Sequence, residues 1–259
     1  MNIDLTNKRA LICGSTAGIG FAVAEALTKL NCQVTLVARN EEKLKSALEK
    51  LHGNGHSYLK ADFSNPDVLK ETIDGHIASD NNYHILINNT GGPPGGPAAN
   101  AKQDEFLKAF NMHLICNHTL AQALIPGMKA AAYGRIINII STSVKQPIAG
   151  LGVSNTIRGA VANWSKTLAT ELAPHGITVN NVLPGATNTG RLNEIAANRA
   201  SRSGKSTADE FQAFADATPM QRVGEPWEIA AGVAFLASPS ASYISGINLP
   251  IDGGRTKSL

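Results

Sequence analysis

The strongest constraint on the fold is a regular alternation between short apolar runs and longer segments with helical periodicity. The run HILIN at 84–88, for example, shows no alternation of polar and apolar residues, which is typical of a strand that is buried on both faces. Strands that are separated by helix-length segments form right-handed βαβ units and a parallel sheet. The sequence therefore predicts a single-domain, three-layer, doubly wound α/β fold.

The alternation also predicts where the elements lie. Strands are expected at 9–13, 33–38, 57–62, 84–88, 134–140, 176–184 and 247–251. Helices are expected at 18–30, 41–51, 66–78, 103–115, 117–132, 151–173 and 226–237. The pattern thus predicts a seven-stranded sheet in one domain of residues 1–259, with 184–225 as a long irregular insertion before the last strand.

Composition excludes several classes of function. The net charge of +3 is small, and no run of Lys and Arg indicates a nucleic-acid partner. No apolar run reaches the roughly 18 residues that a membrane span needs, and the start MNIDLTNKRA does not resemble a signal peptide. The three cysteines, Cys13, Cys32 and Cys116, are widely spaced and odd in number. We therefore expect a reduced cytoplasmic protein with no membrane contact and no metal site.

A glycine-rich segment, CGSTAGIG at 13–20, directly follows the first predicted strand and opens the first helix. Gly14, Gly18 and Gly20 have the spacing G-x-x-x-G-x-G. Glycine permits a tight turn and a close approach to a pyrophosphate, and the helix N-terminus offers free N–H groups to that anion. The segment therefore predicts a dinucleotide site; a tight strand-to-helix turn without a ligand is the alternative.

This spacing resembles that of the short-chain dehydrogenase/reductase family, and the resemblance covers almost the whole chain. The motifs that carry it are NNTG at 88–91, where the family has Asn-Asn-Ala-Gly, GRIINIIS at 134–141, ELAPHGITVNNVLPGATNT at 171–189, and IDGG at 251–254. The pattern is most similar to that of the β-ketoacyl-acyl-carrier-protein reductases. The resemblance implies a Rossmann fold and a reductase of carbonyl substrates, with a place in fatty acid metabolism.

The end of the second strand bears on the choice of dinucleotide. NAD-preferring folds carry an acid there, whereas this chain has Arg39 and Asn40. A guanidinium suits a 2′-phosphate, so NADP(H) is favoured over NAD(H), unless Arg39 is a solvated turn residue. The resemblance places further residues along the cofactor. The full expected set is Gly14, Ser15, Thr16, Gly18, Ile19, Gly20, Arg39, Asn40, Asp62, Phe63, Asn89, Gly91, Ser154, Arg158, Pro184, Gly185, Thr187 and Thr189.

The catalytic positions depart from the family, which uses Asn, Ser, Tyr and Lys. Counting between motifs places the serine at Ser141, the tyrosine position at Ser154, the lysine position at Arg158, and the asparagine position at His113. Asn111 is nearby if the register slips. One of the four family residues is thus retained, and the chain resembles a subgroup of β-ketoacyl-reductase-like proteins that lack the usual tetrad.

The replacements change the available chemistry. Serine is a far weaker acid than tyrosine and is shorter, while arginine stays protonated and cannot relay a proton as lysine can. Ser154 and Arg158 are four residues apart, so they share a helix face and can hold the nicotinamide ribose. Lys145 and His113 are candidate proton donors, although Lys145 as a solvated side chain and His113 as a satisfied helix residue are the plain alternatives.

Two loops complete the expected site. TGGPPGGP at 90–97 is either a substrate wall or a rigid surface turn. The insertion 184–225 is the expected substrate lid, and its Arg and Lys residues suit an anionic substrate unless they form a solvated face.

Three functions remain open from the sequence. The first is an NADP(H)-dependent oxidoreductase of a small-molecule carbonyl or acyl thioester, with a rearranged acid/base set. The second is a dinucleotide-binding pseudoenzyme with a regulatory or partner-subunit role. The third, a nucleotide-sugar epimerase, usually needs a larger C-terminal domain. By resemblance we also expect a homo-oligomer, a tetramer, that pairs helices 103–132 and 151–173 across a two-fold axis.

Overall fold

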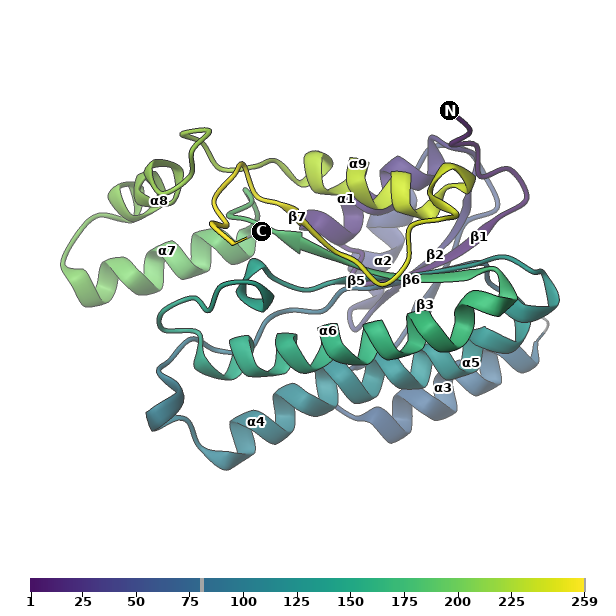
Figure 1. The fold of residues 1–259 in the computed structure, drawn as a ribbon, viewed down its shortest axis with the longest axis horizontal. Helices are drawn as coiled ribbons and strands as arrows, with labels where there is room; N and C mark the ends of the chain where they lie inside the picture. Colours follow the sequence, from purple (N-terminus) through teal and green to yellow (C-terminus); the bar gives the residue numbers. More distant parts are fainter. Residues whose placement is uncertain (80–81, 259) are drawn as a thin grey trace.

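A computed structural model of the chain, which describes residues 1–79 and 82–258, contains one parallel sheet of seven strands (Figure 1). The strand order is β3-β2-β1-β4-β5-β6-β7, and every pairing between neighbours is parallel. The chain starts in the middle of the sheet, moves to one edge and then returns to build the other half. The predicted doubly wound α/β fold is confirmed.

The elements lie close to their predicted positions. The strands are β1 Arg9–Cys13, β2 Gln33–Ala38, β3 Ser57–Lys60, β4 Ile85–Asn88, β5 Gly134–Ile139, β6 Ile177–Pro184 and β7 Asn248–Ile251. The helices are α1 Gly18–Thr28, α2 Glu41–Leu48, α3 Pro66–Ala78, α4 Gln103–Phe110, α5 Cys116–Ala130, α6 Gly152–Leu172, α7 Gly190–Ser203, α8 Thr207–Asp216 and α9 Pro226–Ala237. Among these described helices, none combines the length and the apolar character that a membrane crossing requires.

Two helical layers cover the sheet (Figure 1). The alternation of side chains along β1 explains how both faces become apolar: Ala10 and Ile12 pack into one core with α1 and α9, whereas Leu11 and Cys13 pack into the other with α3 and α5. All four side chains are fully buried. Burial of the sheet on both faces accounts for the continuous apolar runs of the sequence.

The expectation that 184–225 is irregular is wrong, because this segment contains the helices α7 and α8. Thr189 caps α7 by accepting a hydrogen bond from the Leu192 N–H at 3.4 Å. Ser206 and Asp209 form a capping box at the start of α8. The two helices pack against each other beyond the carboxyl ends of the strands (Figure 1).

One row of asparagines crosses the buried sheet. Asn88, Asn138, Asn181 and Asn248 stand in register on β4, β5, β6 and β7. Neighbouring amides in the row hydrogen-bond at 2.8 Å, 3.0 Å and 2.8 Å, and Ser165 of α6 also accepts from Asn138. Because buried polar groups are costly unless they are paired, this row fixes the register of four strands and the seat of α6.

Candidate functional site

The glycine loop between β1 and α1 forms a tight cradle. A Cβ atom at Gly14 would lie 2.5 Å from the Asn89 carbonyl oxygen, and one at Gly20 would lie 2.2 Å from the Gly14 carbonyl oxygen. Gly14 and Gly18 have φ values of +58° and +55°, which favour glycine. At the start of α1, the N-cap residue Ala17 has no side-chain acceptor. The first-turn N–H groups of α1 therefore have no side-chain cap and can bind an anion, so the loop fits a dinucleotide pyrophosphate.

The ends of three strands meet at this cradle. The Asn89 side-chain amide donates to the carbonyls of Cys13 at 3.3 Å and Gly14 at 3.2 Å, which ties the end of β4 to the loop. A Cβ atom at Gly18 would lie 3.3 Å from Cγ2 of Thr189, so the segment after β6 reaches the loop from the other side. The structure thus brings together residues of the predicted cofactor set that lie far apart in the sequence.

Some predicted cofactor residues have their side chains engaged within the protein. The hydroxyl of Ser15 is fully buried and accepts from the Val37 N–H at 2.9 Å. The ring of Phe63 is 7% exposed and packs in the core beneath α3 and α5. Ile19 packs against the core of α1 and α9. These three residues can contact a cofactor through the backbone, whereas their side chains stabilise the fold around it.

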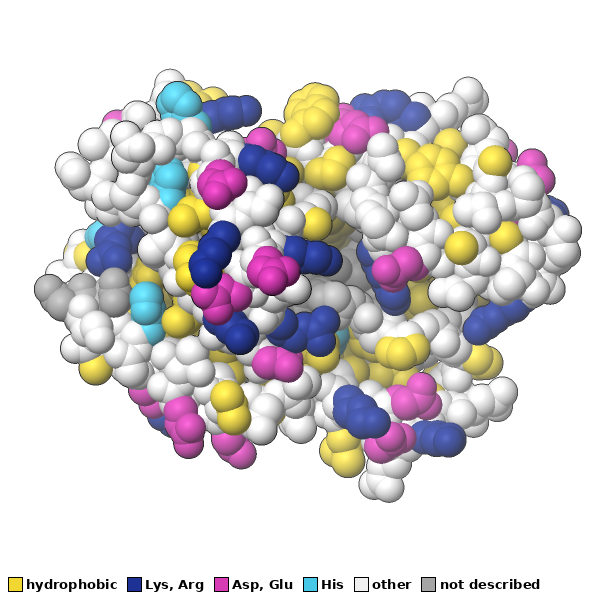
Figure 2. All heavy atoms as spheres, turned by 180° about the vertical axis from the view of Figure 1, so that it is seen from behind, with side chains coloured by type: hydrophobic (Ala, Val, Ile, Leu, Met, Phe, Trp, Pro, Cys, Tyr) yellow, Lys and Arg dark blue, Asp and Glu magenta, His cyan; other side chains and the backbone are white. Residues whose placement is uncertain are grey.

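The end of β2 carries an available cation. Arg39 is exposed, and its guanidinium makes no hydrogen bond or ion pair within the described part of the chain. Asn40 caps α2 by accepting from the Lys43 N–H at 2.8 Å. Lys43 and Thr16 line a neighbouring hollow of about 210 Å³. Figure 2, which views the molecule from behind, shows a hollow near the middle of that face with Lys and Arg side chains on both sides.

The remaining predicted cofactor residues lie at the strand ends or in loops. Asp62 is exposed and accepts from the Ser64 N–H at 2.9 Å. Gly91 is exposed in the loop after β4. Pro184 ends β6, and a Cβ atom at Gly185 would lie 2.7 Å from the Asp252 Cα atom. The C-terminal segment packs so closely against position 185 that it leaves no room for a side chain, which explains why a glycine stands there.

Thr187 follows in the same turn after β6. It is 5% exposed, and its hydroxyl donates to the Gly185 carbonyl at 3.1 Å. Thr187 thus holds the backbone that leads to Thr189 and α7.

The serine and arginine of the motif GVSNTIRG lie in the first two turns of α6. Ser154 is half-buried, and its hydroxyl makes no hydrogen bond with the described residues. Arg158 is 7% exposed and donates one hydrogen bond, 3.3 Å long, to the Ile139 carbonyl. Burial lowers the pKa of Arg158 to about 10, so this side chain stays charged at neutral pH.

Ser141 lies at the end of β5, beside the start of α6. Its hydroxyl accepts from the Ser143 N–H at 3.1 Å, which caps the short 3-10 turn Thr142–Val144. This turn packs against α6. The hydroxyl keeps its own proton available for a substrate carbonyl.

His113 lies in a single π-helical turn, Asn111–Ile115, between α4 and α5. It is 1% exposed, its Nδ1 atom lies 2.6 Å from the Thr90 hydroxyl, and its Nε2 atom is buried without a partner in the described chain. Burial, and secondly the charge of Arg158, lower the pKa of His113 to about 3. Burial therefore favours the neutral ring near neutral pH, which opposes the expected role of His113 as a proton donor.

Lys145 follows the 3-10 turn after Ser141. Its side chain is half-buried and makes no hydrogen bond or ion pair with the described residues. Lys145 is therefore free of internal partners within the described residues.

The lid contacts the loop after β4 through residues that the sequence did not single out together. Arg191 at the start of α7 donates to the Pro93 carbonyl at 2.9 Å. Gly96 pairs with Leu151 and exchanges backbone hydrogen bonds with Gly150 at 2.7 Å and Gly152 at 2.9 Å. The Gly/Pro loop is therefore held in place by the start of α6 and by the segment 184–225, which is compatible with both of its interpretations, a substrate wall and a rigid turn.

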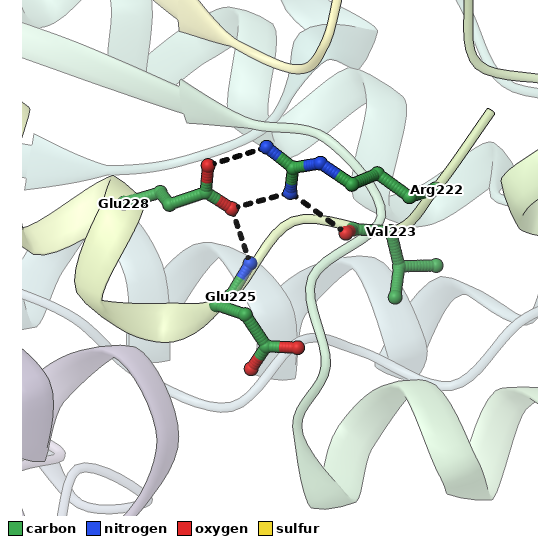
Figure 3. A network of polar contacts seen from close by, with 4 residues as sticks. All are labelled: Arg222, Val223, Glu225 and Glu228. Carbon is green, nitrogen blue, oxygen red and sulfur yellow. Dashed lines mark hydrogen bonds and ion pairs between the residues drawn. The ribbon is translucent and has the colours of Figure 1, made fainter. Parts of the chain in front are cut away.

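A second set of contacts holds the other end of the lid (Figure 3). Arg222 forms a bidentate ion pair with Glu228 at 2.7 Å for both bonds, and Glu228 also accepts from the Glu225 N–H at 2.8 Å. Arg222 additionally donates to the Val223 carbonyl at 3.2 Å. The pair holds the pKa of Glu228 down at about 2. It lines a cavity of about 300 Å³ between the lid and the C-terminal segment.

Comparisons with known proteins agree with this geometry. Residues 14–256 match the model of a family described as enoyl-(acyl carrier protein) reductase. A 3-oxoacyl-[acyl-carrier-protein] reductase of Rickettsia prowazekii is 35% identical over 257 residues, which are 97% of this chain and 98% of that protein. An NADPH-dependent reductase of Bacillus subtilis is 30% identical over 259 residues, which are 98% of this chain and 100% of that protein.

Solved structures extend the similarity to the whole chain. The crystal structure of L-sorbose reductase from Gluconobacter frateurii, complexed with NADPH and L-sorbose, superposes with a TM-score of 0.94 at 30% identity. The match covers 100% of both chains.

Proposed function

The chain belongs to the short-chain dehydrogenase/reductase family of NAD(P)-dependent oxidoreductases, and we propose that it is an NADP(H)-dependent reductase of a carbonyl compound with a rearranged acid/base set. The observation that carries the proposal is the cradle of Gly14, Gly18 and Gly20 at the uncapped start of α1. The preference for NADP(H) rests on Arg39, which is exposed and has no partner among the described residues at the position where NAD-preferring folds carry an acid.

The residues around the cradle have distinct proposed roles. When bound, NADPH supplies a hydride to the carbonyl carbon, and the carbonyl electron pair moves to oxygen. Ser141 donates a hydrogen bond to that oxygen, and Arg158 places positive charge beside it. Ser154 and Arg158 hold the nicotinamide ribose. Lys145 is the proposed source of the proton that the oxygen takes, because an aliphatic hydroxyl is too weak an acid for this step.

The proposed substrate is a small-molecule carbonyl or an acyl thioester, which enters between the Gly/Pro loop and the lid 184–225. A homotetramer is proposed as the assembly. It is supported by Leu107 and Phe110 of α4, which are 57% and 37% exposed although both are large and apolar. Small residues on α6, such as Gly159 and Ala160, allow a second helix to approach closely.

A binding protein without turnover is the second candidate. It is favoured by one observation: Ser154, Arg158 and His113 replace three of the four catalytic residues of the family, and His113 is held neutral. Two measurements on the same protein separate the candidates. NADPH affinity is measured by titration, and NADPH consumption is followed by absorbance over a panel of ketones, oxo acids and acyl thioesters. Consumption with any carbonyl supports the reductase, whereas tight binding without consumption supports the binding protein.

A further inference from the structure

Two arginines are buried in this chain, and the protein satisfies only one of them. Arg135 on β5 is 2% exposed. It donates to the carbonyls of Gly134 at 2.8 Å, Gly176 at 3.3 Å and Ser238 at 3.4 Å. Its guanidinium also lies 4.1 Å from the centre of the Tyr133 ring. Arg135 is therefore a structural residue whose donors and charge are both accommodated by the fold.

Arg158 is buried to a similar degree, but within the described residues it makes one hydrogen bond, to the Ile139 carbonyl. A guanidinium has five N–H donors, so most of its capacity is unused. None of the ion pairs in the described part of the chain includes Arg158. Burial is the sole cause of its lowered pKa, which means that no nearby carboxylate raises it. A buried charge without a counter-charge costs several kcal/mol, and such a group is retained where a ligand compensates it.

The neighbouring side chains do not supply the missing charge. The π-helical turn that carries His113 packs against α6. His113 is neutral, and the charge of Arg158 contributes to holding its pKa at about 3. Ser141 and Ser154 are uncharged. The ribose hydroxyls of a bound dinucleotide would accept hydrogen bonds from Arg158, yet they too are neutral. An anionic group on a second ligand, placed beside Arg158, would compensate this charge.

Cationic side chains also lie on two segments that contact α6 or the loop after β4. Lys145 lies on the turn after β5, and Arg191 reaches from the lid to the Pro93 carbonyl. The C-terminal tail lies beside the same turn, because the Lys257 N–H donates to the Gln146 side chain at 3.2 Å. Positive charges on neighbouring segments attract anionic ligands.

We propose that Arg158 receives the carboxylate of the substrate, and that the substrate is a 2-oxo or 3-oxo carboxylate, reduced to the corresponding hydroxy acid. This inference rests on the proposed function and narrows it from carbonyl compounds in general to oxo acids. A carboxylate accepts two parallel N–H bonds from a guanidinium, which fixes its orientation and leaves a further N–H for the ribose. The hydride adds to the carbonyl carbon, NADPH becomes NADP⁺, and the oxygen takes one proton, while the carboxylate is unchanged.

The test uses binding and not turnover. Oxamate has the shape of a 2-oxo acid but is not reduced, and pyruvamide is an uncharged compound of similar shape. Each is titrated calorimetrically into the whole protein saturated with NADP⁺, for the wild type, Arg158→Gln, Arg158→Lys and the control Lys166→Gln. Lys166 lies on the same helix but is exposed.

In the wild type we expect oxamate to bind at least about tenfold more tightly than pyruvamide, because only the oxamate carboxylate can form charge-assisted hydrogen bonds with Arg158. Arg158→Gln should lose that difference, Arg158→Lys should keep part of it, and Lys166→Gln should behave as the wild type does. Equal affinities of the two probes in the wild type overturn the inference without any variant. Retention of oxamate affinity in folded Arg158→Gln also overturns it. If the wild type does not bind NADP⁺ at all, the proposed function itself is contradicted, and this outcome is distinct from a failure of the oxo-acid inference.

Discussion

The Nδ1 atom of His113 lies 2.6 Å from the hydroxyl of Thr90. Thr90 stands where the family motif after β4 has alanine, and counting between motifs predicts that His113 takes the place of the family asparagine. The contact joins the loop after β4 to the π-helical turn between α4 and α5. Thr90 was not among the predicted site residues, although its departure from the motif NNAG was a visible signal.

Burial of a neutral His113 predicts a specific dependence of stability on pH. Its ordinary pKa is 6.5 and its pKa in the fold is about 3. Between these values the unfolded chain binds a proton that the folded chain does not. The free energy of unfolding therefore falls as the pH decreases from 6.5 toward 3, by at most about 1.4 kcal/mol per pH unit from this group. The free energy of unfolding is measured by urea denaturation at a series of pH values for the wild type and His113→Asn. Its decrease with falling pH should be less steep in the variant. An equal pH dependence in both proteins would contradict a neutral, buried His113.

Arg39 is predicted to select NADPH over NADH. Arg39→Ala should weaken NADPH binding by about 1.5–3 kcal/mol and leave NADH binding nearly unchanged, because it removes a charge-assisted phosphate contact. Fluorescence titration with both dinucleotides measures the two affinities. Lys45→Ala is the matched control, since Lys45 lies nearby on α2 and is paired with Glu41 at 2.9 Å. Equal affinity of the wild type for the two dinucleotides would refute the preference.

Ser154 and Arg158 are predicted to act through binding. Arg158→Ala should weaken NADPH binding by about 1–3 kcal/mol, because a charge-assisted contact is lost. Ser154→Ala should lower kcat by less than about tenfold, because the loss of a general acid costs about 10²–10⁴. Steady-state kinetics with the best carbonyl of the panel measures this. A decrease of about 10³-fold in Ser154→Ala would instead place Ser154 in the proton path.

The asparagine row is predicted to be a main source of stability beneath the site. Asn138 is fully buried and bonds Asn88, Asn181 and Ser165. Asn138→Ala removes three buried hydrogen bonds and leaves the Asn88 amide without its acceptor, whereas Asn181 and Ser165 keep their bond to each other, so the free energy of unfolding should fall by about 2–4 kcal/mol. Urea denaturation measures the change, with Asn163→Ala on the exposed face of α6 as control. A loss no larger than that of the control would show that the row contributes little.

The exposed apolar face of α4 is predicted to be covered in a homotetramer. Light scattering at micromolar concentration should give a tetramer for the wild type and a smaller species for the double variant Leu107→Asp and Phe110→Asp, because buried carboxylates oppose association. Val68→Asp on α3 is the control, since Val68 is also exposed, at 48%. A monomeric wild type would rule out the assembly.

The sequence predicted the sheet because its signals are local. The apolar runs of β1 and β4 predict where the strands lie. The glycine loop predicts where the phosphate cradle lies. The lid was predicted as irregular because α7 has a weak apolar pattern, although the capping box of Ser206 and Asp209 could have indicated α8.

Properties that depend on tertiary burial were not predictable in this way. Neither the neutral state of His113 nor the single hydrogen bond of Arg158 follows from residue type or spacing. The buried hydroxyl of Ser15 and the buried ring of Phe63 likewise depend on what packs over them. The family motif located these residues, but the environment of each one decides what its side chain can do.

We propose that Arg158 serves the bound ligands, whereas Arg135 is a structural arginine. A crystal structure of the NADPH complex tests this difference most directly. We expect the Arg158 guanidinium to lie within about 3.2 Å of a nicotinamide ribose hydroxyl, with the Ser154 hydroxyl on the same face. A guanidinium more than about 4 Å from every cofactor atom, with no bridging water, would contradict it.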